Sequence, residues 1–140
     1  MTLTKKAEWI KPFLEAARPL VPKIRYLRSL DFRKPRKGAV NHAHGITHLD
    51  TWNNIYDIVI HSHAVRVLSR KPLKVTYTPF TLIESLECLA HELAHLRHFK
   101  HTPAHKILEC KIKAKFMCMI KLHGYKSDED YKFKFYLPPH

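Results

Sequence analysis

The sequence lacks any run of about 18 apolar residues, the length that a helix needs to cross a membrane. Its first 20 residues also lack the uninterrupted apolar stretch of a signal peptide, because Lys5, Lys6, Glu8 and Lys11 fall within them. Neither a membrane span nor a secretory leader is therefore expected. We expect a cytoplasmic protein with no membrane partner.

Cysteine is scarce as well. The three cysteines, Cys88, Cys110 and Cys118, are odd in number and show no C-x-x-C spacing, so a disulfide framework is not expected. We interpret them as buried free thiols. With 140 residues, 45% of them hydrophobic, the chain has enough apolar surface for one core. We expect a single domain over residues 1–140, with an extended C-terminal arm at 131–140.

Acidic residues are outnumbered, since 12 Asp and Glu stand against 25 Lys and Arg and leave a formal net charge of +13. Such an excess favours an anionic partner, DNA or RNA before a membrane. The densest basic run is residues 23–37, where Tyr26 and Phe32 lie between the cations and could stack on unpaired bases. The same run could instead be a solvated connector after the first helix. The candidate nucleic-acid contacts are Lys23, Arg25, Arg28, Arg33, Lys34, Arg36 and Lys37.

The apolar spacing of the N-terminal region predicts a helix over residues 4–18, which Pro19 and Pro22 would end. Three later segments look extended because they hold β-branched residues or glycines that favour turns. The first two are expected to pair antiparallel and the third to form a third short strand or an edge, although residues 64–69 could instead be a helical turn. The three segments are 38–50, 55–68 and 73–78.

The hydrophobic period then changes to that of a helix. Leucines between residues 82 and 96 recur at spacings of 4, 3, 4 and 3, which predicts a buried helix with Thr81 as its N-cap. A second long helix is expected from Thr102 as N-cap, with Pro103 at its first position, to Gly124 as C-terminal cap. The predicted fold class is therefore α+β, with two packed C-terminal helices.

The predicted buried helix carries the motif His-Glu-x-x-His. Four residues make little more than one turn, so His91 and His95 project from the same face and can hold one Zn²⁺. Glu92 is about 100° further round the helix, beside the metal, where it can take a proton from a zinc-bound water. A catalytic zinc has three protein ligands. For the third, we favour His101, where the chain turns, over Glu109 in the following helix.

Other residues near the motif have plainer interpretations. Cys88 precedes His91 on nearly the same face, but an ordinary buried thiol is favoured over a metal ligand. His98 and His105 are expected to pack beside the ligands rather than to bind metal. The remaining histidines of the two extended segments could line a second metal site or a substrate cleft, although an ordinary structural role is favoured over both. These are His42, His44, His48, His61 and His63.

The segment HELAHLRHFKHTPAHKILE resembles HELAHL-x-H-x-x-H-S-x-x-F of the SprT-like and YgjP-like zinc metallopeptidases, matching at positions 91, 92, 95, 98 and 101. Position 105, commonly aromatic in that family, is His here. The resemblance implies a small zincin-like fold, in which His91, His95 and His101 bind zinc and Glu92 is the general base. It also implies a protein or peptide substrate. Spartan-like members cleave proteins crosslinked to DNA, which would suit the positive charge.

Two alternatives stand beside an active peptidase. One is a non-enzymatic, basic nucleic-acid-binding protein with a structural zinc, whose closed site would add Glu109 or His140 as a fourth ligand. The other is a latent peptidase whose residues 131–140 occupy its own substrate groove or that of a neighbouring chain. Those residues alternate between apolar and charged side chains, so they could equally form a last strand of the core.

Overall fold

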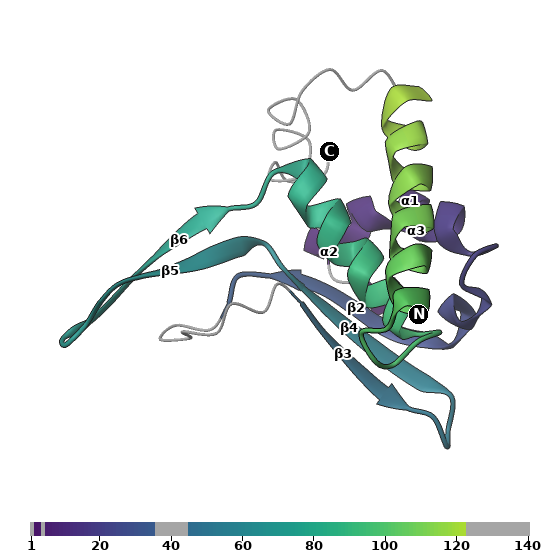
Figure 1. Ribbon diagram of the computed structural model, residues 1–140, viewed down its shortest axis with the longest axis horizontal. Coiled ribbons are helices and arrows are strands. Elements are labelled where there is room, and N and C mark those ends of the chain that lie inside the picture. The colour runs from purple at the N-terminus through teal and green to yellow at the C-terminus, as the bar shows by residue number, and fades with distance from the viewer. Residues whose placement is uncertain (1, 4, 36–44, 123–140) are drawn as a thin grey trace.

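The computed structural model describes residues 2–3, 5–35 and 45–122, and its architecture is α+β, as predicted (Figure 1). The helical elements, with η for a 3-10 helix, are η1 (Lys5–Ile10), α1 (Lys11–Ala17), η2 (Pro22–Tyr26), α2 (Leu82–His95) and α3 (Pro103–Leu122). The strands are β1 (Thr2–Leu3), β2 (Leu27–Arg33), β3 (Gly45–Asp50), β4 (Ile55–His61), β5 (His63–Arg70) and β6 (Leu73–Pro79). The C-terminal arm predicted at 131–140 lies outside the described residues.

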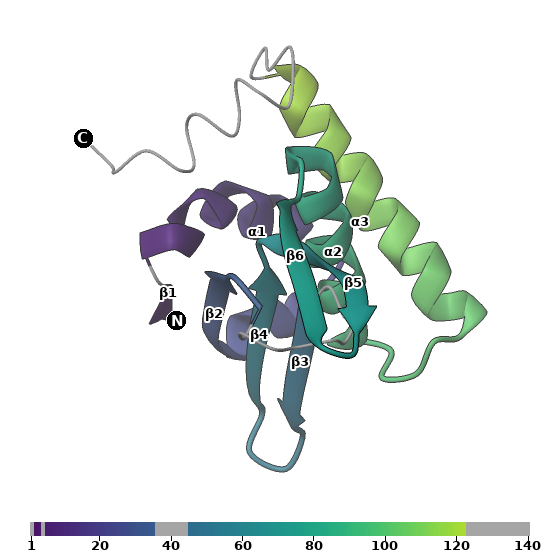
Figure 2. The same cartoon turned by 90° about the vertical axis from the view of Figure 1, so that its left-hand side faces the viewer.

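Four strands form a mixed sheet in the order β1-β2-β4-β3. Strands β1, β2 and β4 run parallel, whereas β3 is antiparallel to β4. Figure 2 shows β2, β4 and β3 side by side in this order. The predicted antiparallel pairing is confirmed for residues 45–50 with 55–60, while 38–44 lie outside the described residues. Strand β3 thus forms an edge of this sheet, and α2 packs against it.

Residues 23–35, the described part of the basic run, are not a solvated connector, so that alternative was wrong for them. Its first residues form η2 and the next seven form β2, which lies between β1 and β4 in the sheet. Leu27, Leu30 and Phe32 are buried, and the Phe32 ring packs edge-on to that of Trp9 at 5.3 Å. Three apolar residues among the cations are therefore enough to make a core strand. The proposed stacking of Phe32 on bases is excluded by this burial.

The N-terminal helix is shorter than predicted, because residues 5–10 form a 3-10 helix and only Lys11–Ala17 are α-helical. Its spaced apolar residues all point into the core, as the periodicity indicated. They are Ala7, Ile10, Leu14 and Ala17, each no more than 1% exposed. The α-helix ends before Pro19, in agreement with the effect of proline on the preceding turn.

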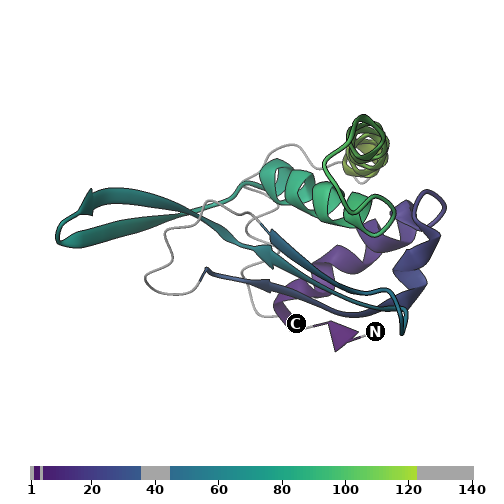
Figure 3. The same ribbon diagram turned by 60° about the horizontal axis from the view of Figure 1, so that its bottom comes forward.

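The extended segment 55–68 is divided at Ser62 into two strands that belong to different sheets. Residues 63–70 form β5 and pair with β6 as a separate antiparallel hairpin, so the alternative of a helical turn at 64–69 was wrong. Segment 73–78 is a strand, as predicted, and it pairs with β5 in this hairpin rather than at the edge of the main sheet. In Figure 3 the hairpin projects beyond the body of the molecule.

Helix α2 is the buried helix that the leucine spacing predicts. Thr81 caps it in a capping box, in which the Thr81 hydroxyl accepts from the Glu84 N–H and the Glu84 carboxylate accepts from the Thr81 N–H. Its leucines are buried against the sheet and against α3, which contributes Leu108, Ile112 and Phe116. No helix in the described part of the chain is both long and apolar enough to cross a membrane.

Helix α3 begins as predicted. The Thr102 hydroxyl accepts a hydrogen bond from the His105 N–H at 3.2 Å, which identifies Thr102 as the N-cap, and Pro103 is the first helical residue. The described helix ends at Leu122, and Gly124, the predicted C-terminal cap, lies outside the described residues. In Figure 3 both α2 and α3 lie on one side of the sheet. The loop between them, residues 96–102, turns the chain from the end of α2 to the start of α3.

Candidate metal centre

Three imidazole side chains meet near the C-terminal end of α2. His91 and His95 project from the last turns of the helix, and His101 comes from the loop that leads into α3. Nε2 of His91 lies 3.0 Å from Nε2 of His101 and 3.2 Å from Nε2 of His95. Nitrogens bound tetrahedrally at about 2.0 to 2.1 Å from one metal would stand about 3.3 Å apart. The two separations from His91 are therefore close to those of ligands on one metal ion, and the ligand atoms of all three residues lie within 4.8 Å of one another, so the group could hold one.

Hydrogen bonds on the outer side of the rings hold two of these histidines in place. Nδ1 of His91 lies 2.5 Å from Oε1 of Glu109, and Nδ1 of His95 lies 3.1 Å from the carbonyl oxygen of His98. With the proton on Nδ1, each ring donates to its oxygen and keeps the lone pair of Nε2 for a metal. Such an oxygen also fixes the orientation of the ring and increases its basicity.

His105 supports the same cluster from α3. Its side chain is buried, and its Nε2 donates to the main-chain carbonyl of His91 at 3.1 Å. Burial lowers the pKa of His105, which favours the neutral ring. Its ring centroid lies 4.3 Å from that of His95. His105 thus packs against the cluster and is hydrogen-bonded to the helix that carries it.

His91, His105 and Glu109 form a second group whose ligand atoms lie within 4.8 Å of one another. The atoms of this group are already engaged, since Glu109 accepts from His91 through Oε1 and from Lys106 through Oε2 at 2.9 Å. Burial alone would raise the pKa of Glu109, but the hydrogen bonds from Lys106 and His91 outweigh it and hold the pKa below its ordinary value. The carboxylate is therefore an anionic acceptor behind His91, and the group of three Nε2 atoms suits a metal better.

Glu92 lies beside the cluster, wedged between α2 and the edge strand β3. It is buried, and its Oε2 accepts a short hydrogen bond from the Thr47 hydroxyl. Gly45, two residues before Thr47, faces the same side chain. A Cβ atom at position 45 would lie 2.9 Å from Cγ of Glu92 and 2.9 Å from the carbonyl oxygen of Val59. Because glycine has no Cβ atom, the Glu92 side chain has space beside position 45.

A cleft of about 760 Å³ runs past this cluster between β3, α2 and α3. On the strand side, Gly45, Thr47 and Leu49 line it. The helices contribute His91, Glu92 and His95, together with charged residues, and the loops contribute Phe99 and His101. The three histidines of the cluster and Glu92 therefore line the same cleft.

The cysteines differ in their surroundings. Cys88 is buried and borders the cleft, and burial raises the pKa of its thiol to about 12. This agrees with its interpretation as a buried thiol. Cys110 and Cys118 are exposed on α3, so the prediction of three buried thiols was wrong for these two. Cys110 also lines the cleft beside His91 and Glu109.

Five of the seven predicted nucleic-acid contacts lie among the described residues, on or beside η2 and β2. Lys23 and Arg25 lie on η2 and Arg28, Arg33 and Lys34 on or after β2. Several are engaged with neighbouring side chains: Arg28 pairs with Asp57 at 2.5 Å, Arg33 with Asp31 at 3.3 Å, and Lys34 lies over the Tyr77 ring. Arg36 and Lys37 lie outside the described residues.

The strand histidines do not join the cluster. His48 is exposed on β3, while His61 and His63 are half-buried at the junction of β4 and β5. Among residues 45–122 and the described N-terminal residues, none of these three belongs to a group that could hold a metal. His42 and His44 lie outside the described residues.

Sequence reasoning missed the residues that surround Glu92 and His91. Thr47 and Gly45 are distant from the motif along the chain, and the only signal for them is a small residue and a hydroxyl two positions apart in a strand. The hydrogen bond from His105 to the His91 carbonyl has no local signal either. These contacts depend on how β3 and α3 pack against α2.

No protein-family model matches the chain, and neither the curated proteins nor the solved structures contain a match.

Proposed function

We propose that the chain is a zinc-dependent metallopeptidase in which His91, His95 and His101 hold the metal and Glu92 is the general base. The observation that carries the proposal is the convergence of three Nε2 atoms beside a buried carboxylate in an open cleft. A bound zinc ion would supply a Lewis acid and lower the pKa of a water that it holds.

Other residues of the chain would position the two histidines and the general base. Glu109 and the His98 carbonyl orient His91 and His95 through their Nδ1 atoms. Thr47 holds Oε2 of Glu92, so that Oε1 is the oxygen that would take the proton from the attacking water and deliver it to the leaving amine. The close approach of Gly45 to the Glu92 side chain restricts the carboxylate to its place beside the cluster.

The substrate would bind as an extended peptide along β3. This strand is the edge of the described sheet, and Gly45, Thr47 and Leu49 on it line the cleft. An exposed edge offers unpaired main-chain groups to which a peptide can add as a further strand. A peptide bound there would pass between β3 and the histidine cluster.

The resemblance of residues 91–109 to the SprT-like and YgjP-like peptidases supports this function and a zincin-like fold. A non-enzymatic protein with a closed structural zinc site is less well supported. Of the two fourth ligands considered for such a site, Glu109 is bonded to Nδ1 of His91, away from the Nε2 cluster, and His140 lies outside the described residues. The cytoplasmic location and an action near nucleic acid remain parts of the proposal.

The test combines metal analysis with one substitution. Protein purified without added metal should contain about one zinc per chain, and it should cleave an unfolded protein such as reduced casein. Glu92→Gln should keep the zinc and lose the cleavage, because the amide cannot accept the proton. Glu15→Gln, an exposed change on α1, serves as the control and should leave both unchanged. Well under one equivalent of zinc, or full cleavage by Glu92→Gln, would contradict the proposal.

A further inference from the structure

The β5–β6 hairpin stands away from the body of the molecule in Figures 1 and 3. Its two strands pair with each other over nearly their whole length, and their main contacts are mutual. At about 3.3 Å per residue, the eight residues of β5 extend over about 26 Å. A two-stranded ribbon is marginally stable by itself in water, so we expect the projecting hairpin to bind a partner.

The base of the hairpin is fixed to the sheet. The Ser62 N–H donates to the carbonyl of Arg33 at 2.9 Å, and the Phe80 N–H donates to the carbonyl of Ser62 at 3.0 Å. Ser62 and Phe80 are both buried. The hairpin is therefore held at its base while its far end reaches into solvent.

The hairpin carries positive charge and no negative charge. Residues 63–79 include Arg66, Arg70, Lys71 and Lys74 but no Asp or Glu, and all four cations are exposed. None of them forms an ion pair with another described residue, unlike Arg28 and Arg33 of β2. Uncompensated cations along a projecting ribbon create a positive potential that suits an anionic polymer.

The strand register sorts the hairpin into two faces, because residues directly opposite each other share a face. Arg66 pairs with Thr76, and Ser69 pairs with Lys74 beyond the register shift between Val67 and Ser69. This face is polar, and it presents two cations and several hydroxyls. The other face holds Val65, Val67, Val75 and Tyr77, which are buried or half-buried.

We propose that the β5–β6 hairpin is an arm that binds duplex DNA, with its polar face in the major groove. That groove, about 12 Å wide, admits a two-stranded β-ribbon, whereas the major groove of A-form RNA is too narrow for one. Arg66 and Lys74 would contact phosphates or base edges, and Arg70 and Lys71 at the tip would contact phosphates. The hairpin contains no residue of the histidine cluster, so this inference does not rest on peptidase activity.

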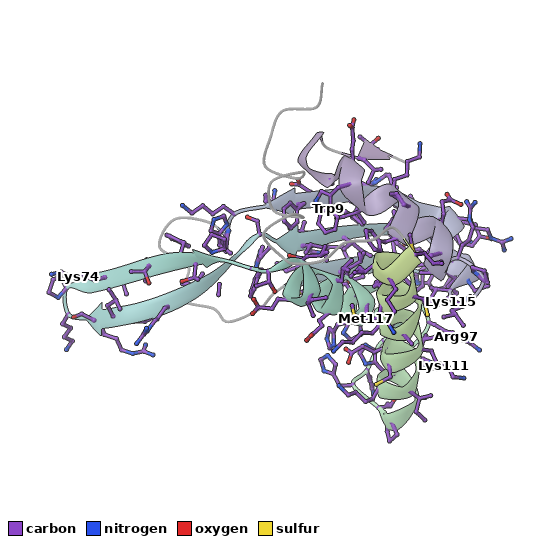
Figure 4. All side chains as sticks on the ribbon, turned by 90° about the horizontal axis from the view of Figure 1, so that it is seen from above. Trp9, Lys74, Arg97, Lys111, Lys115 and Met117 are labelled. Carbon is purple, nitrogen blue, oxygen red and sulfur yellow. The ribbon has the colours of Figure 1, made fainter. Side chains whose placement is uncertain are left out.

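The experiment removes the four cations of the arm and compares a matched control. The arm variant carries Arg66→Gln, Arg70→Gln, Lys71→Gln and Lys74→Gln. The control removes four exposed lysines from the helices, with Lys11→Gln, Lys111→Gln, Lys115→Gln and Lys121→Gln, so both variants have the same net charge. Figure 4 shows Lys74 at the far end of the hairpin, well apart from Lys111 and Lys115 on α3.

Binding of the full chain to a fluorescent 20-base-pair duplex is measured by anisotropy over a range of salt concentrations. Each lost phosphate contact should reduce the slope of log affinity against log salt by about 0.9, so the arm variant should lose about 2 to 4 in slope and at least about tenfold in affinity. The control should retain most of the wild-type affinity. Duplex RNA of the same sequence should bind more weakly than DNA.

A twofold variant, Lys71→Gln with Lys74→Gln, tests the proposal if the fourfold variant does not fold, and it should lose about half as much slope. Equal losses in the arm and control variants would overturn the proposal, as would an arm variant that binds DNA like the wild type. Equal binding of duplex RNA would overturn it too. So would arm-dependent binding to phosphatidylserine vesicles, or arm-dependent self-association in sedimentation, without arm-dependent binding of DNA.

Discussion

The carboxylate of Glu109 lies 2.5 Å from Nδ1 of His91, on the side of the ring that faces away from His95 and His101. This places a residue that sequence reasoning weighed as a third ligand behind a ligand instead. A metal at the Nε2 cluster would draw electron density from His91, and the anionic Glu109 would strengthen that bond.

Metal affinity should therefore fall to different extents in two variants. His101→Ala removes an Nε2 atom from the cluster and should lower zinc affinity the most. Glu109→Gln keeps a hydrogen-bond acceptor without the charge and should weaken zinc binding by about 10- to 100-fold. Competition with a chromophoric chelator measures both. If Glu109→Gln lost more affinity than His101→Ala, Glu109 would be the ligand and His101 would not.

Gly45 should be sensitive to the smallest substitution. Gly45→Ala places a Cβ 2.9 Å from both Glu92 and the carbonyl oxygen of Val59, and the strand or the helix must shift to relieve the contact. We expect a loss of about 1 to 3 kcal/mol in unfolding free energy, the usual cost of overpacking. Cleavage of casein should fall as well, because Glu92 moves. Urea unfolding measures the first effect.

Ile46→Ala is the matched control for Gly45→Ala. Ile46 is the next residue on β3 and is 40% exposed, so its side chain can be removed at a smaller cost. Unchanged stability and activity in Gly45→Ala would show that the close packing of β3 on Glu92 does not matter.

The three thiols should react at two very different rates. Cys110 and Cys118 are exposed, whereas burial raises the pKa of Cys88 to about 12 and leaves almost no thiolate at pH 8. A disulfide reagent such as Ellman's reagent should therefore modify two thiols quickly in the native protein and the third only after denaturation. Cys88→Ser should leave two thiols that both react quickly. Three fast thiols in the native wild type would mean that Cys88 is accessible.

Local periodicity explains which parts of the fold could be predicted from sequence. The leucine spacing of α2 and the four-residue separation of His91 and His95 depend only on helix geometry, so both were predictable. Strand β2 was missed because only Leu27, Leu30 and Phe32 are buried in it, and their spacing is interrupted by a register shift at the start of the strand. Its pairing is parallel with both neighbours, which leaves no hairpin signal in the sequence.

The surroundings of the site could not be predicted for a related reason. Thr47 reaches Glu92 across 45 positions of the chain, and Glu109 reaches His91 across 18. Neither distance corresponds to a helical or strand period, so only the packing of β3 and α3 on α2 brings these residues together. The choice between His101 and Glu109 likewise depended on how the second helix folds back.

The last prediction concerns Asp57 on β4, whose carboxylate accepts hydrogen bonds from Arg28 and from Ser29 on β2. The bonds from Arg28 first, and then from Ser29, hold the pKa of Asp57 below its ordinary value. A carboxyl whose pKa is lowered by folding stabilises the folded state above its ordinary pKa, and this stabilisation is lost as the pH falls through the folded-state pKa. Asp57→Asn should therefore reduce stability at pH 7 but make little difference near pH 2. The measurement is the difference in unfolding free energy between the two proteins at several pH values, which cancels the histidine cluster common to both. In an Arg28→Gln background the same substitution should show a weaker pH dependence, because the largest cause of the low pKa has been removed. A difference that stayed constant from pH 7 to pH 2 would show that the Asp57 carboxylate does not stabilise the fold through its charge.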